Sequence, residues 1–270
     1  MSSRPEMRQA SPFRAAALAL ALIAPWSACR TLGPRPAVDP DIASCIPPDT
    51  LALAGVNLEQ FRASALYQKL PPGASAFLAP LRDASYLALA YNGKDVLAVA
   101  RGAFREPPAG AVLLAKDLAV SGSAQAVRAC TAQHKTGRTG VPWLLSHAAE
   151  VAGASQVWVV AQGGVTFPLS GDAANLNKFL SLVDYASVAI HLDSGVRIDV
   201  LGAGRTPESA EHLEENLRAF FSLAAAGAQR DRALADVLHS VQVQRDGLTV
   251  RAGIAASPEE IAKLAGLVAP

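Results

Sequence analysis

One stretch of sequence decides the fold: Ser187-Val188-Ala189-Ile190-His191-Leu192, then Asp193-Ser194-Gly195, then Val196-Arg197-Ile198-Asp199-Val200. Two runs rich in β-branched and apolar residues flank a short polar turn, which is the pattern of an antiparallel hairpin. Thr206-Pro207-Glu208 then opens a helix, because the Thr hydroxyl can accept from a free amide and Pro misses no donor at the first position. The stretch predicts two strands followed by a helix.

The same order of elements occurs again further along the chain. Ser240 to Arg245 leads through Asp246-Gly247 into Leu248 to Ala252, and Ser257-Pro258-Glu259 follows. Valines alternate with polar residues in the first run, which is the period of two of a half-buried strand. Asp-Gly supplies the residues of a tight hairpin turn, and Ser257 with Glu260 fits a capping box. A ββα unit is therefore predicted twice.

Both predicted helices have one apolar face, which we expect to lie on the sheet. The apolar positions are Ala210, Leu213, Leu217, Phe220, Phe221 and Ala224 in the first helix, and Ile261, Leu264, Ala265 and Val268 in the second.

The N-terminal half carries a looser version of the same pattern. A strand at Thr50–Val56, a helix that starts at Asn57 and a hairpin at Asn92-Gly93 follow one another. Their order resembles a strand at Gln156–Ala161, a helix near Ala173–Leu182 and the Asp193 hairpin. Ser123–Gln133 is expected to be a further helix, and 101–110 a loop. We therefore predict an α+β fold with a mostly antiparallel sheet built from repeated hairpins, covered on one face by amphipathic helices, with internal duplication as a possibility.

The N-terminus resembles a secretory signal at residues 1–28. Three arginines precede an apolar run, Ala15 to Ala24, and small residues stand at its exit. The run is about half of the roughly 20 residues that a membrane-spanning helix needs. We expect an exported protein, with lipidation of Cys29 or ordinary signal cleavage nearby as the two routes, and a soluble cytoplasmic N-terminus as the alternative to export.

Ser27-Ala28-Cys29 resembles the end of a bacterial lipobox, in which the cysteine receives a diacylglyceryl group. Trp26 departs from the pattern, because an aliphatic residue is usual there. Arg30 is not the Asp that is associated with retention at the inner membrane. Cys29 is therefore the expected site of lipid attachment, in a membrane that faces the periplasm or the exterior.

The region after Cys29 is rich in proline and has little apolar periodicity, so residues 29–48 are predicted to be a tether. The remaining chain divides into an N-terminal α+β half at 49–152 and a C-terminal α+β half, with the repeated ββα unit, at 153–270. An N-terminal arm that lies on the domain is the alternative to a tether.

The charge of the chain excludes some partners. The formal net charge is +1, and the first 28 residues hold three arginines and one glutamate, so the rest of the chain has a net charge of −1. Without a basic block, the chain has no electrostatic footprint for nucleic acid or anionic lipid. Attachment to a membrane would have to come from the lipid.

Two further cysteines, Cys45 and Cys130, are a candidate disulfide pair in an oxidising compartment. The bridge would close a loop of about 85 residues and, on the chain-entropy model, stabilise the fold by roughly 4 to 5 kcal/mol at most. Two unpaired cysteines are the alternative.

The sequence carries no known catalytic, nucleotide or metal motif, so no catalytic residue, cofactor or metal is predicted. Of the five histidines, only His134 has metal-ligand spacing to a cysteine, Cys130, and no second pair completes a zinc site. Gly202-Ala203-Gly204 stands between a strand and a helix, but Pro207 occupies the place of the third glycine of a nucleotide loop, and the segment is interpreted as a plain loop.

Three other groups are interpreted as structural. Trp158 is expected to fill the core. The acidic residues of the tether and the basic residues around His134 are interpreted as solvated charge rather than as ion sites. These groups are Asp39, Asp41 and Asp49, and Arg128, Lys135 and Arg138.

Three short segments carry a resemblance: Pro47-Pro48-Asp49-Thr50, Ala54-Gly55-Val56-Asn57-Leu58 and Arg62-Ala63-Ser64-Ala65-Leu66-Tyr67-Gln68-Lys69-Leu70. Together they resemble the start of uncharacterised exported bacterial lipoprotein-like proteins. The resemblance covers about 25 residues and implies no activity.

These observations favour a non-enzymatic, lipid-anchored protein of the cell envelope that binds or assembles with an unknown envelope protein or ligand. The alternative is an exported hydrolase with a site assembled from distant residues, for which a deep pocket lined by His191 or His239 and a nearby carboxylate would speak. A third class would bind peptide strands at a free sheet edge.

Overall fold

The computed structural model describes residues 38–69, 78–168, 176–193, 195–228, 232–257 and residue 260. The predicted signal, Cys29 and the predicted last helix, apart from Glu260, lie outside these residues. Among the described residues, no helix has the length and hydropathy needed to cross a membrane.

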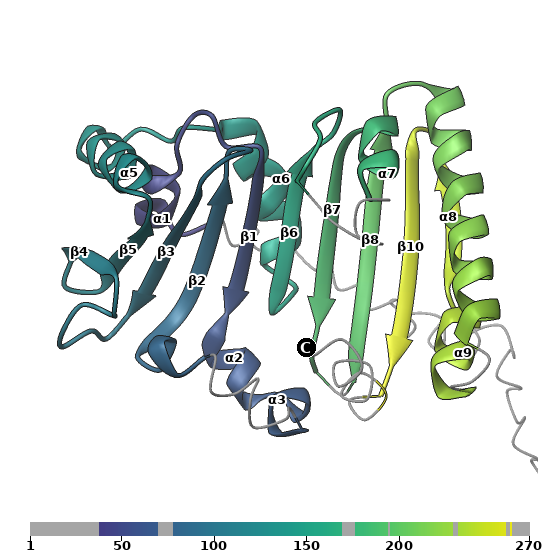
Figure 1. Ribbon diagram of the computed structural model, residues 1–270, viewed down its shortest axis with the longest axis horizontal. Coiled ribbons are helices and arrows are strands. Elements are labelled where there is room, and N and C mark those ends of the chain that lie inside the picture. The colour runs from purple at the N-terminus through teal and green to yellow at the C-terminus, as the bar shows by residue number, and fades with distance from the viewer. Residues whose placement is uncertain are drawn as a thin grey trace, which may run out of the picture. The chain divides into compact units, whose positions relative to one another are not determined.

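The described strands form one ten-stranded sheet in which every neighbouring pair is antiparallel (Figure 1). The strand order is β4-β5-β3-β2-β1-β6-β7-β8-β10-β9. The strands are β1 (Ala52–Asn57), β2 (Ala84–Tyr91), β3 (Val96–Gly102), β4 (Ala111–Ala115), β5 (Leu118–Gly122), β6 (Val157–Gln162), β7 (Val183–His191), β8 (Val196–Gly204), β9 (Gln242–Asp246) and β10 (Thr249–Ala256).

The two halves of the sheet meet where β1 pairs with β6. Counted outward from this seam, β1-β2-β3-β5-β4 and β6-β7-β8-β10-β9 have the same order. A duplicated half would give this arrangement, and the duplication itself stays a prediction.

Helices connect the strands of both halves. They are α1 (Pro40–Cys45), α2 (Leu58–Ala63), α3 (Ala65–Lys69), the 3₁₀ turn η1 (Ala79–Leu81), α5 (Ala124–Thr136), α6 (Pro142–Ala152), α7 (Leu176–Leu182), α8 (Pro207–Gly227) and α9 (Arg232–His239). The α+β class with an antiparallel sheet, predicted from the sequence, is confirmed.

The predicted hairpins turn where expected, although β7 begins earlier and β8 and β10 end later than predicted. Gly93 turns β2 into β3 with φ of 95°, and Gly247 turns β9 into β10 with φ of 58°. Both values lie in the left-handed region that glycine adopts without strain. Thr206 caps α8 through a reciprocal pair of hydrogen bonds with Ser209.

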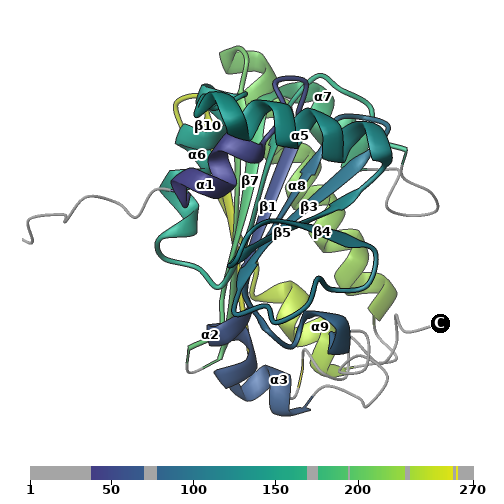
Figure 2. The same cartoon turned by 90° about the vertical axis from the view of Figure 1, so that its left-hand side faces the viewer.

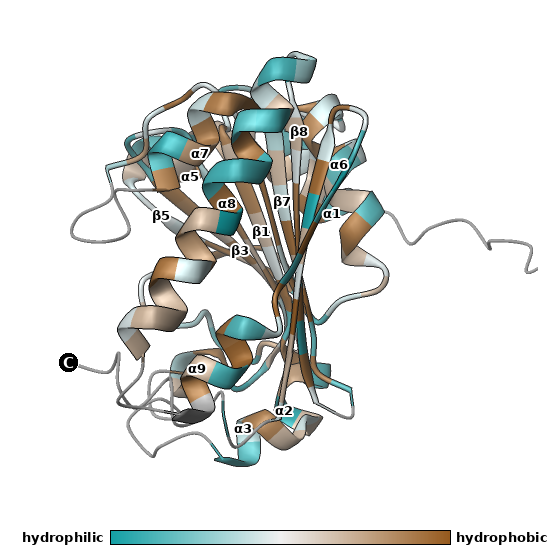
Figure 3. Ribbon diagram, turned by 90° about the vertical axis from the view of Figure 1, so that its right-hand side faces the viewer, coloured by the Kyte–Doolittle hydropathy of each residue, from teal (hydrophilic) through white to brown (hydrophobic). Residues whose placement is uncertain are grey.

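Helices cover both faces of the sheet, so the expectation of a single covered face was wrong. The face of Trp158 and Val160, called here the Trp158 face, packs against α1, α5 and α6. The opposite face, called here the α8 face, packs against α7 and α8 through Leu213 and its neighbours. Figure 3 shows α1 and α6 on one side of the sheet, and α8 and α9 on the other.

The packing of α8 explains the glycines near the end of β8. Gly202 and Gly204 lie within the strand, so the prediction of a loop was wrong. A Cβ on Gly202 would come within 2.7 Å of Leu213, and one on Gly204 within 2.9 Å of Ala210. The strand therefore needs glycine at both positions for α8 to approach it.

The predicted tether is wrong over its second part. Residues 40–45 form α1, which Asp39 caps and which begins with Pro40. Ile42, Cys45 and Ile46 have no exposed surface, because α1 packs against α5 and β3 on the Trp158 face (Figure 2). The six residues are too few to show helical periodicity, and only the Asp-Pro start was readable. Residues 29–37 lie outside the described part of the chain.

Candidate functional site

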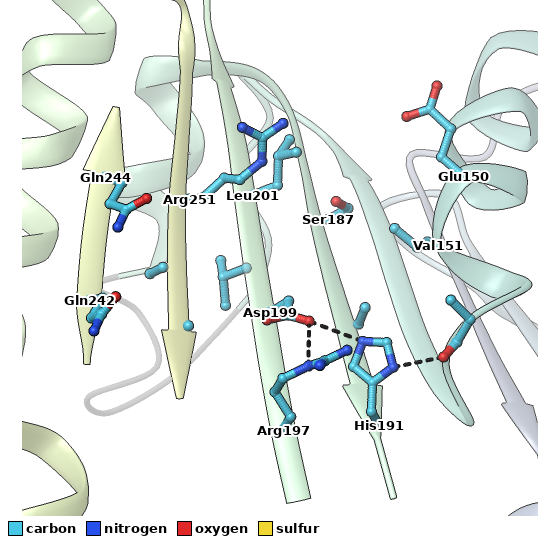
Figure 4. Close-up of a pocket in the computed structure, with 15 residues that line it drawn as sticks. Glu150, Val151, Ser187, His191, Arg197, Asp199, Leu201, Gln242, Gln244 and Arg251 are labelled. Atoms are coloured by element: carbon cyan, nitrogen blue, oxygen red, sulfur yellow. Dashed lines mark hydrogen bonds and ion pairs between the residues drawn. The ribbon is translucent and has the colours of Figure 1, made fainter. Parts of the chain in front are cut away.

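In the C-terminal half, the described helices leave part of the Trp158 face uncovered. The helices that pack on β8, β9 and β10 are α8 and α9, which lie on the other face. Next to α6, this open face forms a pocket of about 500 Å³, called here the polar pocket (Figure 4). Its polar lining residues include Glu150, Ser187, Gln242, Gln244, Arg251 and the cluster of His191, Arg197 and Asp199.

Strand register brings these side chains to one face. Ser187, Leu201, Arg251 and Gln244 are consecutive cross-strand partners from β7 to β9. Because paired residues of antiparallel strands point to the same side, each such row crosses the sheet on the Trp158 face. The pocket floor therefore carries polar side chains from four strands, with apolar residues such as Leu201 between them.

His191 holds one end of the pocket. The residue is 9% exposed, Nδ1 lies 2.7 Å from the carbonyl oxygen of Ala154, and Nε2 lies 3.0 Å from Oδ2 of Asp199. Arg197 Nε also donates to Asp199, at 3.1 Å. Both ring nitrogens of His191 therefore face oxygen acceptors of the protein.

This arrangement lacks a general base. In a hydrolytic triad one ring nitrogen binds the carboxylate and the other faces the nucleophile, whereas here the second nitrogen binds Ala154. The hydroxyl in the pocket, Ser187, is four residues from His191 on β7, a separation of roughly 13 Å. Among the described residues of the pocket, the histidine and carboxylate therefore form a structural pair.

An aromatic stack stands beside the other end of the pocket. The ring of His147 on α6 lies on that of Tyr185 with centroids 3.8 Å apart, and Trp143 meets His147 edge-on at 5.7 Å. Glu150 lies 3.8 Å from Nδ1 of His147. Burial, followed by the negative charge of Glu150, raises the pKa of Tyr185 above its usual range. Trp143 is 40% exposed, so this end is both aromatic and accessible.

A second charged cluster fastens α1 to the sheet. Arg101 on β3 donates to Asp39 at 2.8 Å, to Asp41 at 2.6 Å, and to Asp117. Burial alone would lower the pKa of Arg101, but its hydrogen bonds to the three carboxylates raise it above the usual range. Asp39 and Asp41 of the predicted tether are thus paired, and Asp49, directly after it, accepts from Asn92.

The two candidate disulfide cysteines are close together. Cys45 on α1 and Cys130 on α5 are fully buried free thiols in one apolar cluster. Ser44 and His134, each close by on the same two helices, hydrogen-bond at 2.7 Å.

The other residues singled out from the sequence lie apart. His212 is exposed and lies 3.6 Å from Glu215, and exposed His239 binds the carbonyl of Ala235. Arg128, Lys135 and Arg138 are exposed around the end of α5. Trp158 is 1% exposed and fills the core as predicted. In the described part of the chain, no three acidic, His or Cys side chains are placed to hold a metal.

Sequence reasoning named a pocket lined by His191 with a nearby carboxylate, but it did not identify Asp199 as that carboxylate, and it missed the Arg101 cluster. The His191–Asp199 pair could have been predicted, because both residues lie on the hairpin that turns at Asp193. The alternation of side chains along each strand places them on the same face of the sheet. The Arg101 cluster joins residues more than fifty positions apart, and no local pattern indicates it.

Comparison with known proteins gives the fold alone. No protein-family model and no curated protein matches the chain. A solved structure, crystal form III of TP0453, is similar over 86% of this chain and 99% of its own, with 10% identity and a TM-score of 0.50. Crystal form I of TP0453 is similar over 85% and 98%, with 9% identity and a TM-score of 0.49. The class that these findings define is an α+β protein with one antiparallel sheet.

Proposed function

We propose that this chain is an exported cell-envelope protein, anchored by a lipid on Cys29, whose folded body binds a partner or ligand through the polar pocket. The charged start, the short apolar run and Ser27-Ala28-Cys29 support the anchor. The same reasoning places the protein in the periplasm or at the exterior.

The burial of α1 shortens the predicted tether. Val38 is already part of the core, so eight residues separate it from Cys29. A chain of this length spans at most about 30 Å. The anchor would therefore keep the body near the membrane surface, so that the partner is expected in the same layer of the envelope.

The polar pocket carries the binding role. An antiparallel sheet can leave one face exposed to water, so the exposure of this sheet face does not by itself indicate a binding site. What favours binding is a hollow in which polar side chains from four strands converge, next to the helix α6 that also carries an exposed tryptophan. His191, with both ring nitrogens occupied, gives the alternative of a hydrolase little support.

Fractionation of cells tests the anchor. Cys29→Ser should move the protein from floated membranes to the soluble fraction, while the same change at Cys130 should leave it on membranes. Intact mass should show acyl chains on the wild type. Membrane flotation of Cys29→Ser would contradict the proposal.

Site-specific photo-crosslinking tests the binding face. A photoreactive residue at Gln244 points into the pocket, whereas one at the neighbouring Arg245 lies on the α8 face. A discrete adduct is expected at Gln244 only, and equal labelling at both positions would count against the pocket. Ester or amide hydrolysis that His191→Gln abolishes would favour the hydrolase instead.

A further inference from the structure

The contact between α1 and α5 brings two thiols together from distant parts of the sequence. Cys45 and Cys130 both have no exposed surface and share one apolar cluster. The helices pack directly, and the hydrogen bond between Ser44 and His134 holds their relative position next to the cysteines. The two thiols are therefore brought together by the packing of α1 against α5.

The two thiols interact directly. They hydrogen-bond to each other, which raises the pKa of Cys45 and lowers the pKa of Cys130. A thiolate is the nucleophile in disulfide exchange, and either sulfur can serve as that thiolate once α1 is detached.

We propose that Cys45 and Cys130 form a disulfide in the exported protein, which locks α1 onto α5. The oxidant is the disulfide of a thiol oxidoreductase or of glutathione. One of the two cysteine thiolates attacks it and one oxidant thiol leaves, and the other cysteine then attacks the sulfur of the mixed disulfide that belongs to the protein and releases the second oxidant thiol. Two protein thiols become one disulfide, and the oxidant disulfide becomes two thiols.

Burial sets the order of events. Neither sulfur is accessible in the folded chain, so oxidation precedes the docking of α1 or occurs when α1 detaches. The short length of α1 makes such detachment local. The reaction in cells rests on the proposed export, because cytosolic thiols are kept reduced.

Thiol trapping of the full-length protein tests the disulfide. Cells are quenched in acid, and the protein is denatured and alkylated with a maleimide before mass analysis. We expect no adduct on Cys45 or Cys130 without reductant, and two after reduction. The melting temperature should fall on reduction by up to roughly 15 °C, with no such fall for the double variant Cys45→Ala/Cys130→Ala.

A second experiment distinguishes an error in the proposed disulfide from an error in the proposed export. Purified Cys29→Ser protein is reduced and then placed in an oxidising glutathione buffer. If the thiols are reduced in cells but pair in this buffer, the proposed export is overturned and the geometry stands. If folded protein keeps two reactive thiols in the buffer, the disulfide itself is overturned.

Discussion

The pairing of β1 with β6, where the two halves of the sheet meet, allows a direct test of packing in the core. Gly55 in β1 lies directly opposite Trp158 in β6, and a Cβ on Gly55 would overlap the indole ring. Trp158 has almost no exposed surface, and its Nε1 donates to the hydroxyl of Tyr86 at 2.8 Å. Gly55→Ala must therefore displace the ring or the strand.

The cost follows from two effects. Overpacking costs about 1–3 kcal/mol, and loss of the buried hydrogen bond to Tyr86 costs about 1 kcal/mol. The lower entropy of the unfolded alanine chain offsets about 0.5–1 kcal/mol. The net loss of about 1–3.5 kcal/mol corresponds to a fall in melting temperature of roughly 2 to 14 °C for a domain of this size.

Thermal unfolding, followed by circular dichroism and tryptophan fluorescence, measures the loss. Gly227→Ala is the control, because Gly227 ends α8 with nothing within 4 Å of an added Cβ. It should leave stability unchanged or raise it slightly. In a double-mutant cycle, Gly55→Ala should cost clearly less when Trp158 is Phe. Additive effects of the two changes would refute the overlap.

Two further predictions concern charge. Burial raises the pKa of Tyr86 and Tyr185, so the stability that their neutral phenols contribute is present below about pH 10 and is lost as pH rises further. In a pH titration followed by tyrosinate absorbance, two of the four tyrosines should ionise above the usual pH range. A single transition shared by all tyrosines would contradict this prediction. Arg101→Met should lower the free energy of unfolding, measured in urea, by about 1–2 kcal/mol, because Asp39 and Asp41 lose the cation with which they pair. Added salt should reduce this difference between the variant and the wild type. A difference that does not change with salt would rule out this electrostatic cause.

Local rules predicted the hairpins and the helix starts. Asn92-Gly93 and Asp246-Gly247 turn where expected, because few residues adopt a left-handed turn. The capping box of Ser257 and Glu260 is present with both hydrogen bonds. In each case the signal is confined to a few neighbouring residues.

The arrangement of helices could not be predicted in the same way. Which face a helix covers depends on the path of the chain between strands, and α8 crosses to the face opposite α6. The hairpin of β4 and β5 turns at Lys116-Asp117, without the glycine that marks the other turns. Likewise, the helix α1 is stabilised mainly by its packing against α5 and β3, and not by a local sequence signal. These features depend on contacts between distant residues.

The docking of α1 also determines how the protein would bear mechanical load. If the chain is anchored at Cys29, any pull between membrane and partner enters the body at Val38 and passes first into α1. That helix is held by the Arg101 ion pairs at its start and by the Cys45–Cys130 contact at its end. Force would be shared between two attachments on β3 and α5 before it reaches the sheet. An anchored body of this design would stay folded under tension for as long as both attachments hold.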